Sequence, residues 1–405
     1  MVFVKIWVEI DEERLSGNFA ALNGVLAERS GAAMTLLAVV KANAYGHGIA
    51  VCAPILARAG AAWLGVTDAQ EGAAARAALV EAGVPRPEQP RILVMSGMTG
   101  LAEEADLIVR EGLTAVVWDE AHLELLAEAA RRAGVTEPVA VHVEIETGMA
   151  RQGVACGEEL GRLLGRIADM PELGLDGVFT HLASTEVARA AETSEQERRF
   201  EEAVAQVAAA GLRPKWVHIG NSSFIDNGAE PGALRWVSEL AAKLGARAMV
   251  RAGLALYGYL LPIEGAEGEE VALVRPRVRP AMRWKTRVIG LRTVEAGTTV
   301  GYNGTFVAQG RMRLALLPVG YADGLRRELS ASNGRAGGWV MLRGQRAPIV
   351  GRVSMNLTVV DVSAIAEAAV GDEATLLGDG ATAEDQARLA GTIAYEIVCG
   401  VRVSG

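Results

Sequence analysis

The stretch Leu36-Leu37-Ala38-Val39-Val40-Lys41 is a short apolar run that ends in a lysine, and it begins a pattern that continues to about residue 260. Each apolar run is followed by a Gly-rich or polar turn and then by a segment with helical spacing. Glu120–Arg132, for example, places Leu123, Leu126 and Ala130 on one face. We expect buried parallel strands at Leu36–Val40, Ala62–Val66, Arg91–Met95, Leu113–Trp118, Pro138–Ile145, Leu175–Thr180, Lys215–Ile219 and Arg247–Val250.

Eight alternating strand and helix units in about 250 residues are typical of a (β/α)8 TIM-type barrel. We therefore predict an α/β barrel domain over residues 12–261, with a leading helix at Glu12–Glu28. After the acidic, Gly-rich segment Glu264–Glu270 the sequence becomes rich in β-branched residues and turns, which predicts a mainly-β domain over residues 262–405, together with residues 1–11. Its expected strands are Trp284–Leu291, Met312–Val319, Trp339–Leu342, Ala347–Val353, Leu357–Val362 and Ala374–Leu377, with a short helical segment near Ala383–Leu389.

Composition excludes several classes of function. The 405 residues are 50% hydrophobic and 22% charged, with a formal net charge of −9, so no sequence-wide positive field attracts nucleic acid or an anionic membrane. No apolar run approaches the roughly 18 residues of a membrane span. Met1–Asp11 lacks the basic and apolar regions of a secretion signal, and Cys52, Cys156 and Cys399 have neither disulfide nor metal spacing. We expect a cytoplasmic enzyme without a metal.

Barrel enzymes carry their active-site residues just after each strand, at the C-terminal face. This rule selects polar residues from five of the expected repeats. The last two groups follow strands seven and eight, where barrels often bind phosphate through backbone N–H groups and hydroxyls. The selected residues are Lys41 to His47, Gly148 with Arg151, His181, Asn221 to Ser223, and Arg251 to Leu254.

Lys41 is the most informative of these residues, because the chain has only five lysines against 35 arginines. A solvated lysine at the end of a strand is the simple alternative. A partly desolvated lysine, however, has a lowered pKa and can form a Schiff base. Combined with a phosphate pocket and an arginine, such a lysine suggests pyridoxal 5'-phosphate as cofactor.

The segment Ala38–Gly48 resembles the cofactor-lysine signature of the alanine racemase family of pyridoxal-phosphate-dependent amino-acid racemases. The resemblance runs through the whole chain. Its further landmarks are Trp7–Asp11, Thr147–Arg151, Thr180-His181, Asn221-Ser222, Arg251–Gly258, Val300–Tyr302, Leu317–Gly324, Gly351–Asn356 and Tyr395–Ile397.

The resemblance implies a two-base 1,1-proton transfer that interconverts L- and D-amino acids, alanine first. Lys41 would hold the cofactor and act as base on one face of the substrate α-carbon. Tyr302 would act on the opposite face from the partner subunit of a homodimer, with a core tyrosine as the alternative. The usual product use would be D-alanine biosynthesis.

The resemblance also implies the cofactor and substrate contacts. Arg251 would face the pyridine nitrogen, where a guanidinium can only donate. His181 would lie against the ring, and the phosphate would be held by Tyr45, Asn221, Ser222, Tyr395 and the backbone of Gly253 and Leu254. Arg151 would bind the substrate carboxylate with its forked donors, and Tyr321, Met355 and Asn356 would line the substrate end. We interpret His122 and His142 as structural, because neither has a partner motif.

Three positions depart from the family's usual pattern at the substrate end. Glu144 stands where many members have a carbamylated lysine, so we expect it to supply negative charge without carbamylation and to leave a gap to Arg151. Ser354-Met355-Asn356 replaces Cys-Met-Asp, which removes a charge near the substrate. These changes leave open a racemase for larger or basic amino acids, and a homologue that binds the cofactor without catalysis.

A decarboxylase on the same two-domain plan is a further alternative. We disfavour it because the sequence has no Gly-Gly-Gly phosphate loop and because the Tyr302 motif belongs to racemases.

Overall fold

The computed structural model describes residues 5–265 and 272–402, and the chain divides into two compact units. The first unit contains Glu13–Ala44 and Gly48–Arg279. The second contains Met1–Glu12, Tyr45–His47 and Pro280–Gly405. Most of the acidic, Gly-rich segment Glu264–Glu270 lies outside the described residues.

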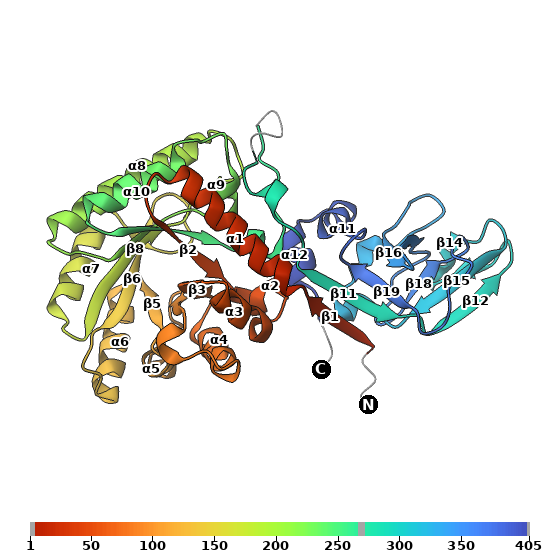
Figure 1. The fold of residues 1–405 in the computed structure, drawn as a ribbon, viewed down its shortest axis with the longest axis horizontal. Coiled ribbons are helices and arrows are strands. Elements are labelled where there is room, and N and C mark those ends of the chain that lie inside the picture. The colour runs from red at the N-terminus through yellow and green to blue at the C-terminus, as the bar shows by residue number, and fades with distance from the viewer. Residues whose placement is uncertain (1–4, 266–271, 403–405) are drawn as a thin grey trace. The chain divides into compact units, whose positions relative to one another are not determined.

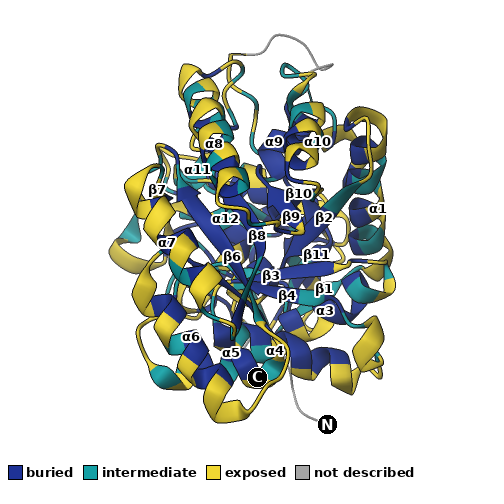
Figure 2. Ribbon diagram, turned by 90° about the vertical axis from the view of Figure 1, so that its left-hand side faces the viewer, coloured by how far each residue is buried: buried dark blue, intermediate teal, exposed yellow. Residues whose placement is uncertain are grey.

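The first unit is built around a closed barrel, whose strands are buried (Figure 1, Figure 2). Within the described residues eight parallel strands close the barrel, because β5 pairs with both β4 and β6. Each expected run overlaps one of them, so the predicted barrel is confirmed. In barrel order they are β5 (Thr114–Val117), β4 (Arg91–Val94), β3 (Trp63–Val66), β2 (Met34–Val39), β10 (Arg247–Ala252), β9 (Trp216–His218), β8 (Leu173–Thr180) and β6 (Val139–Glu146).

Amphipathic helices follow the barrel strands. In α6 (Glu120–Ala133) the side chains of Leu123, Leu126 and Ala130 are buried, as the helical spacing predicts. Asp119 caps its first turn by accepting a hydrogen bond from the backbone N–H of His122 at 2.9 Å. The other helices of eight or more residues described in this unit are α1 (Glu12–Arg29), α3 (Ile49–Arg58), α4 (Ala69–Glu81), α5 (Ala102–Glu111), α7 (Glu158–Asp169), α8 (Ala191–Ala209) and α10 (Ala233–Lys243).

The segment directly after β2 has an unusual backbone. In α2 (Lys41–Tyr45), residues Ala42, Asn43 and Ala44 have φ between 52° and 55°, and Tyr45 has φ 53°. The left-handed conformation costs roughly 1–2 kcal/mol for each residue that carries a Cβ. This turn therefore stores strain immediately after Lys41, at the C-terminal end of a barrel strand.

The second unit consists mainly of antiparallel sheets, as the sequence predicts. Among the described residues, β1 (Ile6–Ile10) pairs with β11 (Met282–Arg287), and this pair extends into a five-stranded sheet. That sheet continues through β19 (Glu373–Leu377), β16 (Trp339–Leu342) and β17 (Gln345–Pro348). A second sheet has the order β12 (Gly290–Val294), β15 (Met312–Leu317), β18 (Thr358–Asp361), and β13 (Thr299–Val300) pairs with β14 (Phe306–Val307). Two helices, α11 (Ala383–Ala390) and α12 (Ala394–Cys399), follow these strands.

The expected single strand Trp284–Leu291 is wrong, because the chain changes sheet within it. The backbone N–H of Val288 donates to the carbonyl of Asp372 at 2.9 Å, and that of Ile289 donates to Leu316 at 2.9 Å. These two acceptors belong to different sheets. The segment expected as one strand therefore belongs partly to β11 and partly to β12, and a sequence pattern of period two does not show where the first strand ends and the second begins.

Across residues 5–265 and 272–402, no helix combines the length and the apolar character that crossing a membrane requires.

The strained turn gives a stability prediction. Ala42 is exposed, so replacing it by glycine removes the left-handed penalty without opening a cavity. Ala42→Gly is expected to raise the free energy of unfolding by about 1 kcal/mol in denaturant titrations. The matched control is Ala77→Gly, at an exposed position of α4, which is expected to lower it by about 1 kcal/mol. Equal destabilisation by both variants would contradict the strain at Ala42.

Candidate active site

A cavity of about 230 Å³ lies at the C-terminal ends of the barrel strands. Three of the residues selected from the sequence line it, namely Lys41, Arg151 and His181, and they come from three different strand-to-helix connections. Sequence reasoning missed several other lining residues that carry no motif of their own. The full lining consists of Lys41, Thr67, Met95, Ser96, Glu144, Arg151, Gln152, Phe179 and His181.

Lys41 is positioned by the turn that follows it. The backbone N–H of Ala44 donates to the carbonyl of Val40 at 2.8 Å, and the side chain of Asn43 accepts from the N–H of Ile49 at 2.8 Å. The N–H of Asn43 donates to the carboxylate of Glu71 at 3.0 Å. These bonds hold the left-handed turn against its strain and fix where the Lys41 side chain leaves the barrel strand.

Arg251 in β10 is 2% exposed and has three hydrogen-bond acceptors. Its guanidinium donates to the carbonyl of Thr180 at 3.0 Å, to Nδ1 of His181 at 3.2 Å and to Nδ1 of His218 at 3.1 Å. It also lies over the ring of Phe179, 5.1 Å from the centroid. Burial lowers the pKa of Arg251 to about 10, so the guanidinium remains a cation at neutral pH.

His181 is a neutral imidazole in this site. Burial, and then the positive charges of Arg251, Arg151 and Lys41, lower its pKa to about 3. Because Nδ1 accepts from Arg251, the proton of the neutral ring lies on Nε2. His181 can therefore donate or pack against a flat ligand, but it carries no charge near pH 7.

Glu144 in β6 is a buried carboxylate that lines the cavity with two cations, Lys41 and Arg151. Its Oε2 accepts a short hydrogen bond from Nε2 of Gln152, which also donates to the carbonyl of Met95 at 3.0 Å. Burial raises the pKa of Glu144, although the Gln152 bond and the charges of the nearby arginines oppose this effect. Gln152 thus provides a hydrogen-bond donor for the buried carboxylate of Glu144.

Arg151 reaches the cavity from a turn that the neighbouring carboxylate of Glu146 organises. Glu146 accepts a short hydrogen bond from the N–H of Gly148 and a longer one, 3.4 Å, from the N–H of Arg151. Ala150 within this turn has φ 55°. The turn presents the Arg151 side chain at the exposed rim of the cavity.

The ends of β9 and β10 bring together four further residues selected from the sequence. The hydroxyl of Ser222 accepts hydrogen bonds from the N–H groups of Gly253, at 3.0 Å, and Ala255, at 3.2 Å. Asn221 caps the short helix that begins at Ser222 by accepting from the N–H of Phe224 at 3.0 Å. Leu254 begins the 3₁₀ turn that follows Gly253. Backbone N–H groups and a hydroxyl converge here, and these are the groups that bind phosphate.

The remaining predicted site residues belong to the second unit. The rings of Tyr45 and Tyr395 lie 6.0 Å apart, and burial raises the pKa of Tyr45 far above its ordinary value. Tyr302 begins a 3₁₀ turn after β13, and 66% of it is exposed. Tyr321 and Met355 are also exposed.

Tyr321, Met355 and Asn356 lie close together, because their segments share hydrogen bonds. The N–H of Tyr321 donates to the carbonyl of Ser354 at 3.0 Å. The side chain of Asn356 donates to Asp323 at 3.5 Å. A Cβ at Gly320 would lie 2.1 Å from the carbonyl oxygen of Ser354, so this approach requires glycine at position 320.

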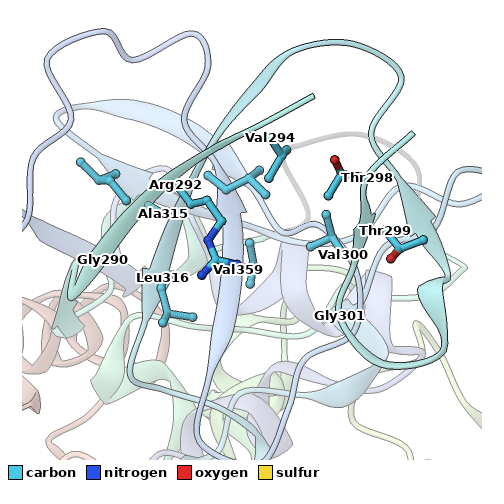
Figure 3. A pocket seen from close by; sticks show the side chains of 12 residues that line it. Gly290, Arg292, Val294, Thr298, Thr299, Val300, Gly301, Ala315, Leu316 and Val359 are labelled. Carbon is cyan, nitrogen blue, oxygen red and sulfur yellow. The ribbon is translucent and has the colours of Figure 1, made fainter. Parts of the chain in front are cut away.

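A second cavity, of about 290 Å³, lies in the second unit between β12, β13, β15 and β18 (Figure 3). Its walls are mainly apolar, and Arg292 extends into it near Val359 and Leu316. It borders a small core cluster that includes Val294, Val300 and Leu314. None of the residues selected from the sequence lines this cavity. It is larger than the barrel cavity but lacks the amine, imidazole and carboxylate groups that chemistry at a small ligand requires.

Comparisons with known proteins agree with this geometry. The family models described as "Alanine racemase, N-terminal domain" and "Alanine racemase, C-terminal domain" match residues 10–261 and 281–404. The alanine racemase of Symbiobacterium thermophilum is 36% identical over 399 residues, covering 98% of this chain and 94% of the relative.

Solved structures give the same result. The alanine racemase from Streptomyces coelicolor A3(2) is 32% identical, with a TM-score of 0.82 and coverage of 98% of this chain and 96% of that one. The alanine racemase from Bartonella henselae, solved with covalently bound pyridoxal phosphate, is 25% identical, with a TM-score of 0.75 and coverage of 99% and 98%.

The chain has the two domains of these relatives and matches their family models. It is therefore an amino-acid racemase, which is an isomerase. It belongs to the alanine racemase family.

The raised pKa of Glu144 predicts a pH-dependent stability. A carboxyl whose pKa is higher in the folded than in the unfolded state destabilises the fold as pH rises from its ordinary value of about 4.3 through the folded pKa. Glu144→Gln is therefore expected to raise the free energy of unfolding at pH 8, because the amide carries no charge that burial disfavours. The gain should shrink at pH 4.

Thermal unfolding at both pH values measures this difference. Glu103→Gln, at an exposed position of α5, is the control and should change stability by less than about 0.5 kcal/mol at either pH. A Glu144→Gln variant that is less stable than the parent protein at pH 8 would contradict the expected penalty of the buried anion.

Proposed function

We propose that this chain interconverts L- and D-alanine with pyridoxal 5'-phosphate, and that the barrel cavity is the place where this occurs. The observation that carries the proposal is that Lys41, Arg151 and His181 line one cavity at the C-terminal face of the barrel, in a chain that is similar to alanine racemases over its full length. An amine, a carboxylate-binding guanidinium and a neutral imidazole around one small cavity suit an amino acid and an aromatic cofactor.

The donor set of the barrel fits this cofactor. Lys41 would provide the amine for its aldehyde. The hydroxyl of Ser222, which here accepts from the N–H of Gly253, would hold its phosphate together with the backbone of Gly253 and Leu254. Asn221, Tyr45 and Tyr395 are the further residues that we assign to the phosphate end. When bound, the cofactor supplies an electron sink that makes the α-proton of an attached amino acid more acidic.

Arg251 is assigned to the pyridine nitrogen of the cofactor, and His181 to its ring. Because the pKa of Arg251 is about 10, its guanidinium offers only N–H donors at neutral pH. Arg251 would therefore donate to that nitrogen and keep it unprotonated, which would favour simple proton return over side reactions. The bond from Arg251 to Nδ1 keeps His181 neutral and in one tautomer.

Two bases on opposite faces of the α-carbon carry out the inversion. Lys41 is assigned to one face and Tyr302 of a partner subunit to the other. One group removes the proton from Cα, and the other, in its protonated form, delivers a proton to the opposite face, so the composition of the amino acid does not change. The support for this pairing is the family membership and the exposure of Tyr302 at a turn.

Arg151 is assigned to the substrate carboxylate, while Tyr321, Met355 and Asn356 are assigned to the substrate entrance. A forked guanidinium binds a carboxylate through two parallel hydrogen bonds. Glu144 and Gln152 supply the negative charge and the hydrogen bond that balance the two cations of the cavity.

We further propose a cytoplasmic homodimer whose active sites are shared between subunits and whose product enters D-alanine biosynthesis. The barrel domain of residues 12–261 would bind the cofactor. The domain of residues 262–405, with residues 1–11, would contribute Tyr302 to the partner's site.

Solvent deuterium exchange at Cα, followed by NMR on a panel of L- and D-amino acids, tests the proposed function. Alanine is expected to exchange fastest. Lys41→Ala should slow this exchange at least about a hundredfold, the usual contribution of a positioned acid or base. Lys243→Ala, at an exposed lysine of α10, should leave it unchanged. Preferred exchange of larger or basic amino acids would contradict alanine as substrate, and no exchange of any amino acid would contradict catalysis.

Tyr302→Phe distinguishes the two proposed bases, which act on opposite faces of the substrate α-carbon. Racemisation must slow equally in both directions, because the two enantiomers have equal free energy. Exchange with retention of configuration, through Lys41 alone, should persist for one enantiomer and fall about 10²- to 10⁴-fold for the other. Tyr321→Phe, at another exposed tyrosine of the same unit, is expected to affect both enantiomers alike. Equal effects of Tyr302→Phe on the two exchange rates would refute the two-base assignment.

A further inference from the structure

Three buried polar side chains continue from Arg251 into the barrel interior. Nε2 of His218 lies 2.9 Å from Nδ1 of His142, and Nε2 of His142 lies 3.3 Å from Oδ2 of Asp176. With the bond of 3.1 Å between Arg251 and Nδ1 of His218, these contacts form one continuous hydrogen-bonded chain. Its members come from β10, β9, β6 and β8. We name Arg251, His218, His142 and Asp176 the polar chain.

The chemistry of arginine fixes every proton in the polar chain. A guanidinium only donates, so Nδ1 of His218 accepts and the proton of this ring is on Nε2. That N–H donates to Nδ1 of His142, which leaves the proton of His142 on Nε2, where it donates to Asp176. Burial lowers the pKa of both histidines, so both rings are neutral. A single pair of tautomers therefore satisfies all three hydrogen bonds.

Asp176 stays ionised, so its carboxylate can only accept the hydrogen bond from His142 at the end of the polar chain. Its Oδ2 lies 2.8 Å from Arg91, and its Oδ1 lies 3.4 Å from the exposed Lys215. Burial acts to raise the pKa of Asp176, but the bond to His142 and the nearby charges of Arg91 and Lys215 outweigh it and lower the pKa to about 2. A carboxylate and a guanidinium, both charged, thus stand at opposite ends of two neutral imidazoles.

The backbone of β8 is shaped to admit the polar chain. The pairing of β6 with β8 shifts register between Val141, which faces Leu175, and His142, which faces Gly177, so that Asp176 is an extra residue. A Cβ at position 177 would lie 2.6 Å from ring atoms of His142. The irregular register and the glycine together make room for the imidazole in a close-packed barrel.

We propose that Asp176 is a positioning residue for Arg251 and that it acts through the tautomers of His142 and His218. The carboxylate holds the proton of His142 on Nε2, and this ring in turn leaves Nδ1 of His218 free to accept from Arg251. The fork of Arg251 is then fixed by His218, His181 and Thr180 at once. The inference rests on the proposed assignment of Arg251 to the cofactor, but the polar chain itself does not depend on that assignment.

The first measurement is the ¹⁵N spectrum of the imidazoles in the holoenzyme, labelled at its five histidines. Long-range ¹H–¹⁵N correlations report which ring nitrogen carries the proton. Both His142 and His218 are expected as neutral Nε2–H tautomers at pH 7. An Nδ1–H tautomer or an imidazolium at either residue would overturn the proposal, whatever the racemase activity of the protein.

Variants of Asp176 test its action on Arg251. Asp176→Leu keeps the branched shape of the side chain but removes the acceptor, and Arg91 and Lys215 are exposed enough to turn to solvent. His142 and His218 should then show tautomer mixtures, and kcat should fall on the order of tenfold, as for other carboxylates that orient a functional histidine, with a smaller change in KM. Asp176→Asn, which retains an acceptor oxygen, should restore the single tautomers and most of kcat.

Lys215→Met is the matched control, because it removes an ion-pair partner of Asp176 without touching the polar chain. It should leave the imidazole spectrum and kcat unchanged. Unaltered histidine signals in Asp176→Leu would refute the coupling to Asp176. A protein with the expected tautomers but no racemisation would refute the proposed function and not the polar chain.

Discussion

The buried guanidinium of Arg251 is the constraint on which the C-terminal face of the barrel depends. A cation removed from water requires acceptors on every side, or it destabilises the fold by several kcal/mol. Here two imidazoles and a carbonyl accept from it, and the ring of Phe179 lies against it. The tautomers of His181 and His218 follow from this requirement, so one residue organises the protons of the site.

Strain and charge are concentrated near the same cavity. The turn after Lys41 holds residues with side chains in the left-handed region, and the hydrogen bonds of Asn43 maintain it. Glu144 is a buried anion that is satisfied by Gln152 and opposed by burial. Both features are unfavourable for stability. Each lies beside the barrel cavity to which we assign the reaction.

Much of the fold and part of the site could be predicted from local sequence. Each buried parallel strand is a short apolar run, and each is followed by a helical period, so the barrel could be counted. The sheet exchange at Val288 and Ile289 could not be predicted, because it depends on acceptors that lie far away in the chain, at Asp372 and Leu316. The hydrogen-bond partners of His142 could not be predicted for the same reason, since they lie on two other strands.

The sequence alone determined the eight repeats, the lysine that ends the first strand and the ordered motifs that identify the family. These are patterns among residues that are close in the sequence, so they can be recognised without knowledge of the folded conformation. Only the tertiary structure decided that Gln152 satisfies Glu144 and that Asp176, His142 and His218 form a continuous chain to Arg251. His142 and His218 are 76 residues apart, and barrel closure brings their rings within hydrogen-bond distance. Protonation states follow from such contacts, because the group that faces a ring nitrogen decides whether this nitrogen carries the proton.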